Sequence, residues 1–321
     1  MTKTVIVADI GGTHTRLGLW EDGALRAPEK LKTASCEHLS ELVTAYRDRH
    51  GLPLETPFAF ATAANPFADG TWRFTNLEGR SFTLSDFGKC GLKVLVAEDD
   101  FAATAYGCIA KKDREGVIAL RAGNPVADAP KIVLGPGTGL GMGYGFTRFG
   151  KIMVQKTYGG HMLFTPVTER HGEVARAIAS LRALERPVIF EDIACGSAFP
   201  WLFRACAAIG GHADAAMEAD DIFGAPSHPA FIMALDVFHE ALGLFAHTCA
   251  ITLHGFGGIV MNGGFLDALI ERELWSADKF LAGFGQKGVP VVAESLAVMP
   301  VSIVQDTYIS LLGLGAMLDG A

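Results

Sequence analysis

Residues 4–19 read TVIVADIGGTHTRLGL, and this stretch decides the fold. A β-branched run from Thr4 to Ala8 is followed by two glycines and then by a second apolar run from Thr15 to Leu19. This order predicts a strand, a tight glycine turn and an antiparallel return strand. Residues 131–146, KIVLGPGTGLGMGYGF, repeat the same design. The sequence therefore predicts an α/β chain built from two related halves.

The 321-residue chain is apolar and acidic. Half of its residues are hydrophobic and 19% are charged, which excludes wholesale disorder, and its length favours two domains or one large one. Lysine and arginine number 27 against 35 acidic residues, giving a formal net charge of −8. We expect no nucleic-acid partner, because binding a phosphate backbone requires clustered basic side chains. The six cysteines lie far apart, which favours buried free thiols over a zinc site or disulfides.

The sequence also sets expectations about the membrane. The longest apolar tract, Ala241–Met261, is interrupted by His247, His254 and several glycines, so we expect no membrane-spanning segment. The amino terminus has one early lysine and an apolar run that is too short for a secretory signal. A cytoplasmic location is therefore expected.

Helical periodicity and charge divide the rest of the chain. Apolar spacing predicts helices over 39–46, 100–110, 231–249 and 307–318, with buried strands at 58–63 and 94–97. A charged stretch at 111–115 interrupts this pattern. It predicts a boundary between a first domain, residues 1–112, and a second domain that begins at 113.

Three glycine turns follow strands and form the candidate anion sites. They are Gly11–Gly12–Thr13, Gly135–Gly139 and Asn262–Gly263–Gly264. Glycine lets backbone N–H groups point together at an anion, although each turn alone is also explained as a plain tight connection. The GxGxxG match at 283–288 precedes an apolar run and does not follow a strand, so a Rossmann dehydrogenase is not supported.

Two carboxylates stand beside these features. Asp9 ends the first strand and is a candidate for holding hydrated Mg²⁺ against phosphates, or else a local turn carboxylate. Asp100 follows the 94–97 strand and opens a helix. It is a candidate general base for an attacking hydroxyl, with an ordinary helix N-cap as the alternative.

Taken together, these motifs resemble the bacterial glucokinase family of hexokinase-like sugar kinases. The resemblance covers nearly the whole chain, and its motifs occur in the expected order. They are Asp9–Thr13 with Arg16, Asp100–Phe101, Gly137–Gly141, Gly159–Gly160–His161, Gly257–Gly258, Gly263–Gly264, Asp306 and Leu311–Gly313.

The resemblance implies an α/β, two-domain actin-like ATPase fold of the ribonuclease H-like type, with the active site in an interdomain cleft. It implies that the small domain, 1–112, is completed by a carboxyl-terminal helix at about 304–321, and that 113–303 form the large domain. The implied substrates are ATP, with Mg²⁺, and a sugar. A homodimer is implied as well.

Site residues follow from the resemblance by position. Asp100 matches the catalytic base, and the positions matching sugar ligands are Asp99, Asp100, Tyr158, His161 and Glu191. Glu191 is also explained as a helix-start carboxylate, and His161 as a loop histidine. Asp9, at the end of the first strand, is the candidate for holding Mg²⁺ through water. The positions implied to bind ATP are Ala8, Asp9, Ile10, Gly11, Gly12, Thr13, Gly137, Thr138, Gly139, Gly263 and Gly264.

Two positions depart from the family pattern. Asp99 stands where the family usually has Asn, and Tyr158 where it usually has a sugar-binding Glu. A carboxylate only accepts hydrogen bonds, whereas an amide also donates, and a phenol is bulkier. Leaving a buried partner unpaired costs about 1–3 kcal/mol, which is enough to redirect the choice of sugar. The family's zinc-binding relatives carry a cysteine-rich motif that is absent here, so we expect no zinc.

The sequence thus predicts an ATP-dependent kinase that phosphorylates the 6-hydroxyl of a hexose. Asp99 and Tyr158 keep two alternatives open. One is a kinase for a different or modified sugar, and the other is a non-catalytic sugar or nucleotide sensor on the same fold.

Overall fold

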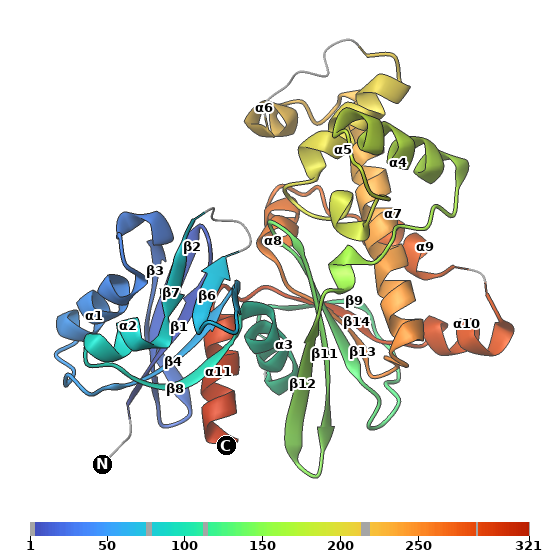
Figure 1. Ribbon diagram of the computed structural model, residues 1–321. Coiled ribbons are helices and arrows are strands. Elements are labelled where there is room, and N and C mark those ends of the chain that lie inside the picture. Colours follow the sequence, from blue (N-terminus) through green and yellow to red (C-terminus); the bar gives the residue numbers. More distant parts are fainter. Residues whose placement is uncertain (1–3, 75–78, 112–114, 213–218, 287, 321) are drawn as a thin grey trace. The chain divides into compact units, whose positions relative to one another are not determined.

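The computed structural model describes residues 4–74, 79–111, 115–212, 219–286 and 288–320 (Figure 1). Two compact units emerge from the contacts within the chain. The first comprises residues 1–115, 145–156 and 306–321, and the second comprises residues 116–144 and 157–305. Residues 145–156, which the sequence assigned to the large domain, group with the first unit. The α/β class expected from the sequence is confirmed.

A five-stranded sheet forms the centre of the first unit, in the order β3-β2-β1-β4-β8. β1 pairs antiparallel with β2 and parallel with β4, which in turn pairs parallel with β8. The predicted strand–glycine turn–return strand is thus confirmed. These strands are β1 (Val5–Ile10), β2 (His14–Glu21), β3 (Ala24–Lys32), β4 (Pro57–Thr62) and β8 (Lys93–Asp99).

Side chains of β1 alternate between two hydrophobic clusters, as expected for a central strand covered on both faces. Ile6, Ala8 and Ile10 pack with residues of α1 and α2, whereas Val5 and Val7 pack with residues of α3 and α11. A small sheet, β5-β6-β7, completes this unit. The bounds are α1 (Leu39–Arg49), α2 (Leu84–Lys89), α3 (Asp100–Ala110), α11 (Ile309–Asp319), the short 3₁₀ helix η1 (Thr33–Ser35), β5 (Ala64–Pro66), β6 (Thr71–Phe74) and β7 (Ser81–Thr83).

The last helix, α11, packs closely on α3 and also contacts β1 (Figure 1). Glycines allow this approach. A Cβ at Gly313 would lie 1.9 Å from the Ala103 carbonyl oxygen, and one at Gly107 would lie 2.2 Å from that of Ile309. Because both positions lack a side chain, the helix that begins with Asp100 is held firmly against its neighbour.

The second unit is built around a six-stranded sheet, in the order β12-β11-β10-β13-β14-β9. β10, β13 and β14 run parallel, and β9 is antiparallel to β14. Most of the β11–β12 hairpin, residues 145–156, nevertheless groups with the first unit, including all of β12 except Thr157. The strands are β9 (Val117–Arg121), β10 (Lys131–Pro136), β11 (Leu140–Arg148), β12 (Lys151–Thr157), β13 (Gly258–Met261) and β14 (Val301–Val304).

Helices supply most of the core of the second unit. The predicted apolar stripe forms α7, whose Phe231, Phe238 and Phe245 are fully buried. The bounds are α4 (Glu169–Leu181), α5 (Phe199–Ile209), α6 (Ala219–Gly224), α7 (Pro229–Thr252), α8 (Gly264–Glu271), α9 (Ala277–Phe284), α10 (Pro290–Ala297), and the 3₁₀ helices η2 (Gly159–His161) and η3 (Phe190–Asp192).

α7 is long and apolar enough to cross a membrane, with a mean hydropathy of 1.4 in its most apolar window. The sequence predicted no membrane-spanning segment and did not single out this helix, which meets these limits on length and composition alone. However, 67% of that window is buried inside the structure, where α7 packs against α5 and α9. This burial is typical of a core helix.

Candidate functional site

Three carboxylates gather at one edge of the first unit's sheet. Parallel pairing aligns Ile10 with Thr62 and Thr62 with Asp99, so β1, β4 and β8 end together. Asp9 lies at the end of β1, Asp99 ends β8, and Asp100 begins α3. Carboxyl ends of neighbouring parallel strands are where α/β proteins place their ligands.

Asp9 is buried and held by two partners. Its Oδ2 accepts hydrogen bonds from Arg16 Nη1 at 3.0 Å and from Ser310 Oγ at 2.8 Å. Burial raises the pKa of Asp9, and the Arg16 charge opposes that shift. Oδ1 makes no hydrogen bond to any residue that the structure describes. This oxygen can therefore accept a hydrogen bond from a water molecule bound to a metal ion.

Asp99 is the N-cap of α3. Its Oδ1 accepts from the backbone amides of Phe101 and Ala102, at 3.0 and 3.1 Å. Its Oδ2 accepts from Lys156 Nζ at 3.2 Å. The alternative interpretation of Asp100 as the N-cap is therefore wrong. Asp99 is the N-cap of α3, and Asp100 is the first residue of the helix.

The pKa of Asp100 is raised, as is that of Asp9. Burial raises the pKa of Asp100 to about 7, and the negative charges of Asp9 and Asp99 act in the same direction. Lys156 opposes the shift. Asp100 forms no ion pair with any described residue, whereas Asp9 has Arg16 and Asp99 has Lys156. A carboxylate with this pKa can take up a proton near neutral pH.

The first glycine turn presents unused donors. Gly11 donates its amide to the His14 carbonyl at 3.1 Å, and the Thr13 carbonyl accepts from Thr33. The amides of Gly12 and Thr13 donate to no residue in the described part of the chain. Ala8 and Ile10 are buried core residues of β1, so they support the turn and are not exposed beside it.

The second turn, Gly137–Thr138–Gly139, is braced from a distant segment. The carbonyls of Gly137 and Thr138 accept from the amides of Gly196 and Ser197, at 2.8 and 3.2 Å. The amides of Thr138 and Gly139 again have no acceptor among the described residues. Both turns thus offer paired N–H groups of the kind that bind phosphate.

Glu191 connects this turn to His161. Its Oε2 accepts from the Leu140 amide at 2.7 Å, and its Oε1 lies 3.5 Å from His161 Nε2. A Cβ at Gly139 would come within 2.7 Å of Oε2, so the turn and the carboxylate touch. Glu191 lies in η3 as a helix-start carboxylate, and it also makes this connection.

Tyr158 lies beside His161 in the same unit. The two rings stack with centroids 5.8 Å apart and an interplanar angle of 22°, and both side chains are largely exposed. A Cβ at Gly160 would lie 2.2 Å from the Leu140 carbonyl oxygen, which explains the Gly-Gly sequence before the histidine.

The third glycine turn lies next to the second. Gly263 follows β13 and is the N-cap of α8, so this turn leads into a helix and not into a hairpin. A Cβ at Gly263 would lie 2.6 Å from the Pro136 carbonyl oxygen. The structure therefore brings Gly263 and Gly264 to the end of β10, where Gly137 begins the second turn.

Two residues that bind the site carboxylates were not predicted from the sequence. Lys156 lies 57 positions from Asp99, and Ser310 lies 301 positions from Asp9. Neither belongs to a local motif, so only the spatial arrangement reveals them. Within the described residues, no group of three or more His, Cys, Asp or Glu side chains is arranged to hold a metal ion.

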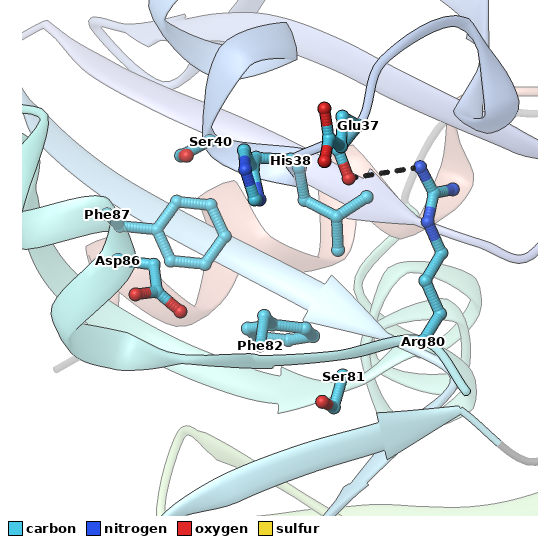
Figure 2. Close-up of a pocket in the computed structure, with 9 residues that line it drawn as sticks. Glu37, His38, Ser40, Arg80, Ser81, Phe82, Asp86 and Phe87 are labelled. Atoms are coloured by element: carbon cyan, nitrogen blue, oxygen red, sulfur yellow. Dashed lines mark hydrogen bonds between the residues drawn. The ribbon is translucent and has the colours of Figure 1, made fainter.

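A hollow of about 40 Å³ in the first unit has no connection with these residues (Figure 2). His38, Arg80, Asp86 and Phe87 line it, and none of them is a candidate site residue. Arg80 donates to the backbone carbonyls of Thr33, Cys36 and Glu37, the last drawn in Figure 2. We interpret these contacts as structural, because they fix the loop that leads into α1.

Comparisons with known proteins agree on one family. The family model described as Glucokinase matches residues 6–321. A glucokinase from Aromatoleum aromaticum is 33% identical over 327 residues, covering 98% of this chain and 95% of that one. One from Paramagnetospirillum magneticum is 31% identical over 284 residues, covering 84% and 85%. The solved glucokinase of an Antarctic psychrotroph has a TM-score of 0.82 and 26% identity, covering 99% of each chain.

Proposed function

Since the chain belongs to the glucokinase family and is a sugar kinase, we propose that it transfers the γ-phosphoryl group of ATP to the 6-hydroxyl of a hexose. The resemblance drawn from the sequence is confirmed at the level of the family. The observation that carries the proposal is the place of Asp100, which begins α3 directly after β8 and forms no ion pair with a described residue. Burial there raises its pKa to about 7.

Asp100 is the proposed general base. A sugar hydroxyl is a poor nucleophile until a base accepts its proton, and a base is most effective when its pKa lies near the working pH. Burial and the neighbouring charges of Asp9 and Asp99 bring Asp100 into that range. We expect the rate to rise with pH through about 7, because the ionised form is the active base.

ATP is proposed to bind through the glycine turns. The amides of Gly12, Thr13, Thr138 and Gly139, which have no acceptor among the described residues, supply N–H donors for phosphate oxygens. Gly263 and Gly264 are proposed to contact the adenosine. Asp9 would hold Mg²⁺ through a water molecule, and the ion would supply positive charge against the phosphates.

The sugar is proposed to bind through hydroxyl contacts with His161 and Glu191, with Asp99 and Tyr158 beside them. A carboxylate and an imidazole together accept and donate hydrogen bonds, as sugar hydroxyls require. The actin-like, ribonuclease H-like architecture with an interdomain cleft belongs to the same proposal. So do the limits of the two domains, with residues 145–156 assigned to the first, the cytoplasmic location and the homodimer.

The test is sugar-stimulated release of ADP. Purified protein is incubated with Mg-ATP and a panel of hexoses, amino sugars and sugar acids. Glucose, or another hexose with a free 6-hydroxyl, should stimulate ADP release. If no sugar does so, the proposal fails.

Asp100→Asn separates the base from nucleotide binding. We expect kcat to fall by roughly 10²–10⁴-fold while the Kd for ATP stays within about twofold. The variant should be at least as stable as the wild type at pH 8. The pKa of Asp100 is about 7 in the native state, and its ordinary value is 3.8. The free energy of unfolding of the wild type therefore falls as pH rises between these values, and the variant does not have this loss. Turnover retained in a folded variant would exclude Asp100 as the base.

A kinase for a modified sugar is the second candidate. The exposed Tyr158 ring stacked on His161 adds an aromatic surface beside the proposed sugar ligands, and Asp99 adds a carboxylate. The same panel discriminates this case, because an amino sugar or sugar acid would then exceed glucose in kcat/KM. A non-catalytic sensor would instead show stabilisation by ligand without ADP release.

A further inference from the structure

The carboxylate edge of the first unit holds three acids and two cations in contact with them. Arg16 pairs with Asp9, and Lys156 pairs with Asp99. The pKa of Asp100 is affected by members of both pairs. The charges of Asp9 and Asp99 raise it, and the charge of Lys156 lowers it. The charge balance around Asp100 therefore depends on Lys156.

Lys156 comes from β12, far from Asp99 in the sequence. Its side chain is 37% exposed and that of Asp99 is 19% exposed, so the pair is partly shielded from water. The two oxygens of Asp99 have separate tasks. Oδ1 caps α3 through two amides, and Oδ2 accepts from the Lys156 ammonium. No other described cation forms an ion pair with Asp99.

We propose that Lys156 is a positioning residue for phosphoryl transfer, whose ion pair with Asp99 holds the cap of α3 and balances the charge next to Asp100. A cap fixes the first turn of a helix, and Asp100 is the first residue of that turn. The role of Lys156 rests on the proposed function of Asp100 as the base. Its effect on the Asp100 carboxyl does not depend on turnover.

The sign of the expected effect follows from the charges that face Asp100. They are the carboxylates of Asp9 on β1 and Asp99 on β8, which raise its pKa, and the ammonium of Lys156 on β12, which lowers it. From α11 the neighbouring group is the Ser310 hydroxyl, which donates to Asp9. Removing Lys156 should therefore raise the pKa of Asp100, and removing the charge of Asp99 should lower it.

The decisive measurement is the titration of the Asp100 carboxyl by carbon NMR in protein labelled at aspartate, with the signal assigned from Asp100→Asn. Lys156→Met should move the midpoint upward by roughly half a pH unit. Lys156→Arg should restore it, because the charge is kept. Lys151→Met is the matched control, since Lys151 is an exposed lysine at the start of the same strand. It should leave the midpoint unchanged.

Kinetics give a second readout. In Lys156→Met, kcat should fall by about threefold at pH 6 and recover at pH 8.5, because the same carboxyl must ionise at a higher pH. The KM for ATP should not change. A purely structural loss would instead lower kcat equally at both pH values.

The outcomes are separable. The inference on Lys156 is overturned if Lys156→Met and Lys151→Met titrate alike. If Lys156→Met does not fold, Lys156→Gln, which removes the charge but keeps a polar side chain, decides the question. Its Asp100 midpoint should also move upward, and an unchanged midpoint overturns the inference. If the wild type releases no ADP with any sugar, the proposed function fails while the titration still tests Lys156.

Discussion

The two glycine turns of this chain look alike in sequence but obtain their carboxylates in different ways. The first turn follows a strand that carries its own acid, Asp9, which is buried and paired with Arg16. The second follows the uncharged Gly135–Pro136, and its acid, Glu191, arrives from η3 and stays partly exposed. One carboxylate is fixed inside a sheet, and the other forms a surface bridge.

Because of this difference, we expect changes at the two carboxylates to affect different properties of the protein. Asp9 is held by a strand neighbour and by Ser310 of α11, so disturbing it disturbs the fold of the first unit. Glu191 touches the turn through the Leu140 amide and His161 through its other oxygen. Disturbing Glu191 should therefore affect ligand binding more than stability.

Arg16→Met should produce the largest loss of stability. It leaves the buried Asp9 without its cation. Breaking a fully buried ion pair costs about 3–5 kcal/mol, and because the Arg16 side chain is 27% exposed we expect a loss of about 2–3 kcal/mol. The loss should be greater at pH 8 than at pH 5. Without Arg16 the native pKa of Asp9 rises further, so the native state holds a proton that the unfolded chain releases.

Urea unfolding at the two pH values measures this loss. Arg26→Met on β3 is the control, since that arginine is exposed, and we expect its effect to stay within about 0.5 kcal/mol. An equal loss in both variants, or a loss independent of pH, would contradict the assignment of Asp9 as the buried, ion-paired acid of the first turn.

Glu191→Ala should affect binding of the sugar. It removes the acceptor of the buried Leu140 amide and the partner of His161, which costs about 1–2 kcal/mol of interaction and raises the sugar KM roughly tenfold. The KM for ATP should change little, and the loss of stability should stay below that of Arg16→Met. Steady-state kinetics beside Glu185→Ala, an exposed acid upstream, would check this. A larger effect on ATP than on sugar would reverse the assignment.

The same contrast explains what could be predicted from the sequence. Both turns, the α/β class, the α7 stripe and the start of α3 follow from local periodicity and glycine placement, which the sequence contains directly. The cap at Asp99 was missed because Asp99 and Asp100 are equally good capping residues, and only backbone geometry separates them. Lys156 and Ser310 were missed because their partners are distant in sequence.

The smallest expected effect is a change in the sugar KM in Gly139→Ala, for which Gly137→Ala is the matched control. At Gly139 a methyl group would lie 2.7 Å from Glu191 Oε2, so the carboxylate must swing away and weaken its bonds to Leu140 and His161. At Gly137 the nearest atom is 4.0 Å away, so the methyl group fits. We expect the sugar KM to rise about threefold in Gly139→Ala and to stay unchanged in Gly137→Ala.

In the Glu191→Ala background the effect of Gly139→Ala should disappear, because the side chain that the methyl group displaces is gone. If the effect persists there, the turn acts on the sugar by a route other than Glu191, and the surface bridge is not what distinguishes the second turn from the first.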